Sequence, residues 1–300
     1  MPHSEHLQII VNDVVNLADQ RGLPTAALSV SLIDLKTNTY AAYQDQVLRF
    51  PASIAKLFWL VELYAEIEQG LIPADHGNYE IGTCKTDVCQ MIQDSDNEAA
   101  SRIVDLLTNA PSGVDLESEA YENWRTRREK LNRFFQQAAF EGINISQKNF
   151  PIPNLGLDRP QGADLKMRGD LNHPIRNRLS TAQAGKLMYD IVAGQSVSLA
   201  ASQKMLTLLT RYDLQTGAWR KKEYDSIRGF FGEQLPPDIY FASKVGWTSE
   251  SRQEVAFIDS KTGATYILVI FAEHSAYGSD WKIFPDISRL VFDRMTNVQP

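Results

Sequence analysis

The sequence predicts an α/β protein with an added all-α lobe: an antiparallel five-stranded sheet flanked by N- and C-terminal helices, with a large helical insert. Its opening segment contains one amphipathic helix and two strand-like runs, and its long middle carries helical spacing without strand signals. Three strand-like runs and a helix follow at the end. We therefore expect residues 1–70 and 221–300 to form the sheet domain and residues 71–220 an all-helical domain.

The beginning of the chain has the pattern helix, strand, strand, helix. Residues 4–20 place apolar side chains at helical spacing and stop before a glycine. Residues 25–35 alternate like a strand, and "TYAAY" at 39–43 follows a short turn as its partner. A second helix is expected over 53–69, ending at Gly70.

This second helix begins within "RFPASIAKLFWL", residues 49–60. Proline is favoured at a helix start, and apolar residues then recur at the spacing of one buried face: Leu57, Leu60, Val61 and Tyr64. Ser53 and Lys56 lie three residues apart, so they share a helix face. A serine in the first turn lies near free N–H groups and the positive end of the helix dipole, which suits a nucleophile whose attack creates an oxyanion.

Helical spacing continues through the middle of the chain, and strands return near its end. The expected helical segments lie at 87–107 (two pieces joined at 95–97), 117–140, 180–194 and 198–212, with a Pro/Gly/Asn-rich loop over 145–178. Strands are expected at 239–247, 253–260 and 265–273, with a hairpin turn "KTG" at 261–263 and a final helix over 281–295.

Composition and charge argue against several classes of function. With 300 residues and 43% hydrophobic content, the chain can bury a sizeable core. A net charge of −7 argues against nucleic-acid binding, and no apolar run approaches the roughly 18 residues of a membrane span. The five histidines lack metal-ligand spacing and there is no phosphate-binding glycine loop, so we expect no metal and no cofactor.

The terminus and the cysteines leave the cellular compartment open. "MPHSEHLQII" lacks the basic region and apolar core of a signal peptide, so the chain is either cytoplasmic or has lost a leader. Cys84 and Cys89, if both helical, would be displaced by roughly 7.5 Å along the axis, which is long for a disulfide. We expect two separate thiols, although a bridge stays possible if Cys84 precedes the helix.

Three short motifs occur in a fixed order along the chain. Ser53-x-x-Lys56 alone is weak, because serine is a common helix cap and lysine commonly rests its stem on apolar surface. Ser95-Asp96-Asn97 follows in a turn between helices, and Lys244-Val245-Gly246 lies on a strand. Ser95 and Asn97 alone are equally consistent with a cap and a turn, and Lys244 with a solvated strand residue. The order and the element types together make the set specific.

The three motifs and the layout resemble the serine β-lactamase and penicillin-binding protein superfamily, and most of all class A β-lactamases. The resemblance covers most of the chain and implies a β-lactamase/transpeptidase-like fold with an active site in the cleft between the domains. It also implies a β-lactam or peptidoglycan-type peptide as the small-molecule partner, without nucleic acid or membrane span, and a periplasmic or secreted location.

The resemblance assigns each motif residue a role. Ser53 would attack the carbonyl, Lys56 would accept the serine proton through a pKa lowered by burial and a nearby cation, and Ser95 would relay it to the leaving nitrogen. Lys244 would place positive charge beside Ser95 and the substrate carboxylate. Substrate binding would fall to Asn97, Gly246, Trp247, Thr248 and Arg252. The N–H groups of Ser53 and Trp247 would form the oxyanion hole, and Asp96 would brace the turn.

Two departures from the family pattern stand out. Val245 replaces the usual Ser or Thr, which removes a hydroxyl that Thr248 is a candidate to replace. The loop over 148–178 lacks the glutamate of the Glu-x-x-Leu-Asn stretch that positions the deacylating water in class A enzymes. The most similar stretch in this loop is "RGDLN" at 168–172, which has Arg168 in the glutamate position. An arginine cannot act as a general base at neutral pH. Asp170 and Asp164 are candidate replacements, each one methylene shorter.

These observations give three hypotheses. The first is a serine hydrolase that is acylated at Ser53 by β-lactams or D-Ala-D-Ala-like amides and deacylates slowly. The second is an efficient β-lactamase with a replacement base such as Asp170. The third is a non-catalytic module that binds or senses cell-wall peptides, motivated by Val245 and Arg168.

Overall fold

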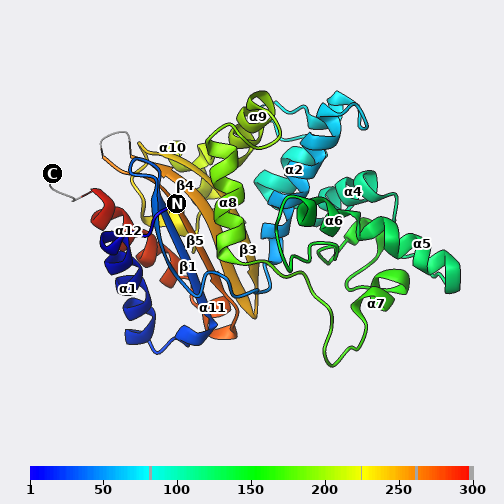
Figure 1. Cartoon of the computed structure of the whole chain (residues 1–300), viewed down its shortest axis with the longest axis horizontal. Helices are drawn as coiled ribbons and strands as arrows, with labels where there is room; N and C mark the ends of the chain where they lie inside the picture. The colour runs from blue at the N-terminus through cyan, green and yellow to red at the C-terminus, as the bar shows by residue number, and fades with distance from the viewer. Residues whose placement is uncertain (81–82, 224, 261–262, 297–300) are drawn as a thin grey trace. The chain divides into compact units, whose positions relative to one another are not determined.

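The computed structural model describes residues 1–80, 83–223, 225–260 and 263–296, and it divides into two compact units (Figure 1). The sheet unit comprises Met1–Ile54 and the chain from Ser180 onward, and the helical unit comprises Ala55–Leu179. Both divisions fall earlier in the chain than the expected 70/71 and 220/221. The second helix packs within the helical unit, and the helix from residue 181 packs on the sheet, which accounts for the difference.

The sheet unit is built on five antiparallel strands in the order β2-β1-β5-β4-β3. The strands are β1 Leu28–Asp34, β2 Thr39–Tyr43, β3 Tyr240–Thr248, β4 Ser251–Asp259 and β5 Thr265–Ala272. All five lie where the sequence predicts strands, so the five-stranded antiparallel sheet is confirmed. The expected "KTG" turn includes residues 261–262, which lie outside the described residues.

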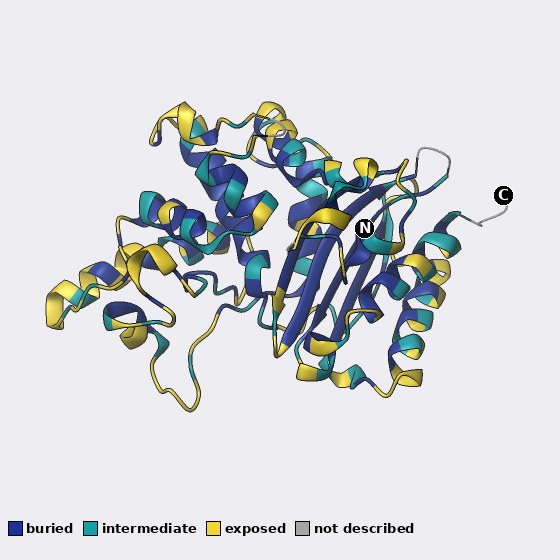
Figure 2. Ribbon diagram, turned by 180° about the vertical axis from the view of Figure 1, so that it is seen from behind, coloured by how far each residue is buried: buried dark blue, intermediate teal, exposed yellow. Residues whose placement is uncertain are grey.

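Helices cover both faces of this sheet, which is why its strands other than the edge strand β2 are buried almost throughout (Figure 2). On one face lie α1 (Glu5–Gln20) and α12 (Ile283–Thr296), which share a core with Leu32, Leu268 and Ile270. On the other lies α8 (Thr181–Val192), where Gly185 approaches Ile33 and Val269. The sheet unit also contains α9 (Leu199–Leu209), α10 (Tyr212–Thr216) and α11 (Ser275–Ser279).

The helical unit surrounds one buried helix. Its elements are α2 (Ala55–Glu68), α3 (Asp87–Cys89), α4 (Asn97–Thr108), α5 (Ser118–Arg128), α6 (Lys130–Gln137) and α7 (Gly162–Arg168), with a π-helical turn at Gln90–Asp94. All residues of α2 from Ala55 to Glu66 are buried, as expected of a helix with neighbours on every side. Phe58 packs edge-to-face on Phe135 and Phe140, and the Trp59 indole donates to the Ile145 carbonyl at 2.9 Å.

Two local expectations need correction. Cys84 and Cys89 form a disulfide with their Cα atoms 5.1 Å apart, so the expectation of two separate thiols is wrong. Helix α3 begins only at Asp87, so Cys84 lies before it and helical rise does not separate the pair. The helix expected over 117–140 is divided at Glu129 into α5 and α6.

Among the helices that the structure describes, none combines the length and hydrophobicity that crossing a bilayer requires. Within the same residues there is no group of three or more His, Cys, Asp or Glu side chains able to hold a metal ion.

One buried carboxyl in α2 makes stability depend on pH. Glu62 is fully buried, and burial, reinforced by the charge of Glu66, raises its pKa from 4.5 to about 8. The folded state holds the Glu62 proton more tightly than the unfolded state does. The stability that protonated Glu62 contributes to folding is therefore fully present below pH 4.5 and is lost as pH rises through about 8. Above pH 8 a buried, charged Glu62 opposes folding.

We expect Glu62→Gln to be more stable than wild type at pH 8.5, by about 1–3 kcal/mol, and to match it more closely at pH 5. Urea denaturation at the two pH values measures this, with the exposed Glu119→Gln as control. Equal pH dependence in wild type and Glu62→Gln would show that Glu62 is not the group responsible.

Candidate active site

In the sheet unit, Ser53 lies beside strand β3. It belongs to a 3₁₀ turn, Ala52–Ile54, that leads directly into α2, and its side chain is partly exposed. A Cβ added to Gly246 would lie 3.1 Å from the Ser53 nitrogen and 2.8 Å from the Pro51 carbonyl oxygen. Only glycine fits such a close approach, so the Gly of the Lys-Val-Gly motif lets β3 contact the serine turn.

The chain immediately before Ser53 is held by a residue of β4 and by the residue that follows β5. The Phe50 amide donates to the Glu273 carboxylate at 3.1 Å, and the Gln253 amide group donates to the Phe50 carbonyl at 2.7 Å. These two bonds satisfy both the N–H and the carbonyl of Phe50, and so hold the backbone that leads to Ser53 in place.

In the helical unit, the structure brings Lys56, Ser95 and Asn97 together. Lys56 lies in the first turn of α2, and its Nζ donates to the Ser95 carbonyl and, at 2.8 Å, to Asn97 Oδ1. The Ser95 hydroxyl oxygen lies 3.4 Å from the same Nζ. Ser95 has a positive φ of 56°, and Asp96 caps α4 by accepting from the Ala99 amide at 2.6 Å.

This environment changes the acidity of Lys56. Burial lowers its pKa from 10.5 to about 7, and the negative charge of Asp96 opposes that shift. The sequence predicts a contribution from a neighbouring cation, but the cause of the lowered pKa is loss of hydration. Near neutral pH a substantial fraction of Lys56 is therefore a neutral amine, which can accept a proton.

Strand β3 carries the other motif residues of the sheet unit. Lys244 is buried, and its Nζ donates to the Val245 carbonyl at 3.0 Å. Val245 packs in the core shared with α1 and α12, and Trp247 is 47% exposed, with its indole donating to the Gly278 carbonyl at 2.7 Å. The Thr248 hydroxyl lies 2.9 Å from the Ser251 hydroxyl and accepts from the Glu250 amide, so it already braces the β3–β4 turn.

Arg252 is placed differently from the substrate-binding role expected of it. Its side chain is fully buried, and its guanidinium donates to three carbonyls: those of Tyr277, Gly229 and Gly278, at 3.2, 2.8 and 3.1 Å. The Trp281 ring lies 4.2 Å from the guanidinium carbon. These contacts make Arg252 a structural clamp, so we leave it out of the proposed site.

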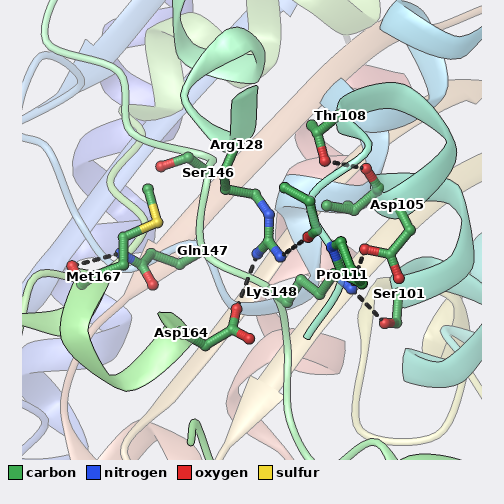
Figure 3. A network of polar contacts seen from close by, with 12 residues as sticks. Ser101, Asp105, Thr108, Pro111, Arg128, Ser146, Gln147, Lys148, Asp164 and Met167 are labelled. Carbon is green, nitrogen blue, oxygen red and sulfur yellow. Dashed lines mark hydrogen bonds and ion pairs between the residues drawn. The ribbon is translucent and has the colours of Figure 1, made fainter. Parts of the chain in front are cut away.

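The two loop aspartates expected as candidate bases, Asp164 and Asp170, are also engaged in other contacts. Asp164 is buried, and its carboxylate receives Arg128 Nη1 at 3.0 Å (Figure 3). Asp170 is exposed and accepts from the Asn172 amide at 2.9 Å, with the His173 ring at 3.4 Å. Arg168 donates to the Lys148 carbonyl at 3.3 Å, and burial lowers its pKa only to about 10, so it stays charged at neutral pH.

Sequence reasoning missed a buried lysine in this loop. Lys148 Nζ donates to Ser101 Oγ at 2.7 Å and to Asp105 Oδ1 at 2.6 Å, both on α4 (Figure 3). Burial is the largest cause that lowers its pKa to about 8. A lone lysine in a loop has no spacing that distinguishes it in the sequence. The only signal lies in its partners, Ser101 and Asp105, which follow Asn97 by one and two turns on the same face of α4.

The chain matches the Beta-lactamase enzyme family over residues 10–295, which is nearly its whole length. The chain belongs to this family. This confirms the resemblance drawn from the motifs, and the protein is a serine hydrolase of the β-lactamase type. No curated protein matches the chain.

Solved structures of low sequence identity share the fold of this family member. A β-lactamase from Sphaerobacter thermophilus DSM 20745 is 16% identical, with a TM-score of 0.63 over 97% of this chain and 98% of that one. PBP-A is 19% identical, with a TM-score of 0.63 over 98% and 97%. A mutant PBP-A, solved as an acyl-enzyme complex with penicillin G, is 18% identical, with a TM-score of 0.63 over 98% of both chains.

If Arg252 is a clamp, its replacement changes stability and not substrate affinity. Arg252→Lys cannot satisfy three carbonyls, so we expect a loss of about 2–4 kcal/mol in unfolding free energy. The KM for carboxylate-bearing β-lactams should change by less than twofold in the folded fraction. Urea denaturation and steady-state kinetics measure both, with the exposed Arg289→Lys as control. A raised KM with unchanged stability would restore the substrate-binding role.

Proposed function

We propose that Ser53 is acylated by β-lactams or by D-Ala-D-Ala-like amides, with Lys56 as the base that activates it. The observation that carries this proposal is the buried Lys56, with a pKa of about 7, bonded to Ser95 and Asn97 three residues after an accessible serine. The PBP-A mutant that was solved as an acyl-enzyme with penicillin G supports the reaction class.

In the proposed reaction, neutral Lys56 accepts the Ser53 hydroxyl proton as the serine oxygen attacks the amide carbonyl. The resulting oxyanion accepts hydrogen bonds from the N–H groups of Ser53 and Trp247. As the C–N bond breaks, the proton passes from Lys56 through the Ser95 hydroxyl to the leaving nitrogen. The products are an acyl-Ser53 ester and a neutral amine, so atoms and charge balance.

The proposed substrate contacts follow from the remaining motif residues. Asn97 would hydrogen-bond the amide side chain of the substrate, and the positive charge of Lys244 would favour its carboxylate. Val245 supplies no hydroxyl for that carboxylate, and Thr248 is engaged with Ser251. We propose weaker carboxylate binding than a Ser or Thr at position 245 would give. That this site lies between the two units stays a prediction.

We propose that deacylation is slow, because neither candidate loop base, Asp164 or Asp170, is available to activate a water. Asp164 is neutralised by Arg128, Asp170 is exposed and occupied by its own turn, and Arg168 remains protonated. A base must reach its water in the right geometry, and an error of about 1 Å can cost 10²-fold in rate.

Acylation is tested by intact-mass spectrometry after exposure to penicillin G. We expect one added penicilloyl group on wild type and on the exposed-serine control Ser249→Ala, and none on Ser53→Ala. Peptide mapping should place the adduct on residue 53. Absence of any adduct on wild type, or equal labelling of Ser53→Ala, would contradict the proposal.

Deacylation is tested by the lifetime of that adduct. We expect Asp170→Asn to change the half-life by less than twofold, because an exposed carboxylate in its own turn does not activate the water. Asp115→Asn, also exposed, is the matched control. A half-life at least tenfold longer in Asp170→Asn alone would identify Asp170 as the base and the protein as an efficient β-lactamase.

A further inference from the structure

The helical unit contains a hollow that is separate from every residue assigned above. It has a volume of about 510 Å³ and lies among the end of α2, the segment after it, the end of α4 and the α5–α6 junction. Its wall includes four leucine or isoleucine side chains, among them Leu71 and Ile72, and three cations: Arg127, Lys130 and Arg133. We call this hollow the basic groove.

The three cations of the basic groove come from the junction of α5 and α6. Arg127 lies at the end of α5 and Lys130 and Arg133 lie in α6, and all three line the hollow at the junction of the two helices. Arg127 Nε donates to the Asn109 carbonyl at 2.9 Å, and Arg133 Nη2 donates to the Thr126 carbonyl at 2.6 Å. Within the described residues, neither guanidinium pairs with a carboxylate, so each keeps donors for a ligand.

The inner side of the basic groove adds little compensating negative charge. Glu66 pairs with Lys130, and Glu62, one turn earlier on α2, is fully buried. Neither Glu62 oxygen has a hydrogen-bond partner among the described residues, and its carboxyl stays protonated at neutral pH. The groove is therefore positive on a chain whose net charge is −7.

We propose that the basic groove binds an aliphatic carboxylate. The carboxylate would accept hydrogen bonds from the guanidinium groups of Arg127 and Arg133. A guanidinium group can donate two parallel hydrogen bonds to one carboxylate. The ligand's alkyl chain would cover the aliphatic wall, where Leu71 is 65% exposed. The volume falls within the range of small-molecule sites, about 300–1,000 Å³. This proposal is independent of acylation at Ser53.

Isothermal titration of the whole chain with decanoate tests the proposal. We expect saturable binding at one site, and at least tenfold weaker binding of decanol, which lacks the anionic head. Arg127→Gln/Arg133→Gln should weaken decanoate binding at least tenfold. Arg125→Gln/Arg289→Gln is the matched control, because it removes the same charge from exposed arginines outside the groove.

Three results would overturn the proposal: no saturable decanoate binding, equal binding by the two double variants, or equal affinity for decanol. All four arginines are exposed, so we expect both variants to fold, and circular dichroism checks this. If the double variant is unfolded, Arg133→Gln alone should still weaken binding at least threefold, and unchanged affinity would overturn the proposal. Penicillin labelling of Ser53 should be unaffected in every folded variant.

Discussion

The removal of the Lys56 ammonium from water is the constraint on which the candidate site depends. A buried ammonium must either be paired with acceptors or give up its proton. Here the acceptors are a main-chain carbonyl and a side-chain amide from the Ser95–Asn97 turn, not a carboxylate. Such partners hold the amine in place without the strong stabilisation of its charge that an ion pair would supply.

This constraint explains several local features of the helical unit. The turn must aim both the carbonyl of Ser95 and the side chain of Asn97 at one nitrogen, which the left-handed conformation of Ser95 and the capping by Asp96 achieve. Helix α2 must be buried on all sides to exclude water, and its residues through Glu66 are. The same burial leaves Glu62 without a hydrogen-bond partner among the described residues.

The loop of residues 146–178 shows the same use of buried polar groups. The Asn177 side chain exchanges two hydrogen bonds with the Gln147 backbone, at 2.9 and 2.7 Å, and so joins the two ends of the loop. Arg128 and Lys148 then attach it to neighbouring helices through one buried and one partly buried ion pair (Figure 3). Buried ion pairs are costly to break one partner at a time, so the loop aspartate at 164 is held for structure.

Much of the fold was predictable because it rests on local spacing. Short strand-like runs bounded by turn residues identified all five strands, and helical periodicity identified α1, α2, α4, α8 and α12 within a few residues. The three motifs identified the family, because their order and element types are specific in combination. The Lys-Val-Gly motif predicted that Gly246 belongs to the site, but it did not show why a glycine is needed there. The structure shows a steric reason, because any side chain at Gly246 would collide with the serine turn.

What the sequence did not reveal depends on contacts between distant residues. The disulfide needed Cys84 to precede α3, which short polar segments do not signal. The buried state of Arg252 comes from carbonyls and an aromatic ring more than twenty residues away, and the Lys148 contacts cross more than forty residues. Charged residues are predicted at the surface by default, so buried ones are missed.

The central claim is that Lys56 is a neutral base near physiological pH, and a direct titration tests it. Carbon-13 NMR of the lysine Cε resonances, with the Lys56 signal assigned from its loss in Lys56→Arg, follows its ionisation. The account predicts a midpoint near 7. A midpoint near the ordinary value of 10.5 would mean that Lys56 stays charged, and it would contradict Lys56 as the base.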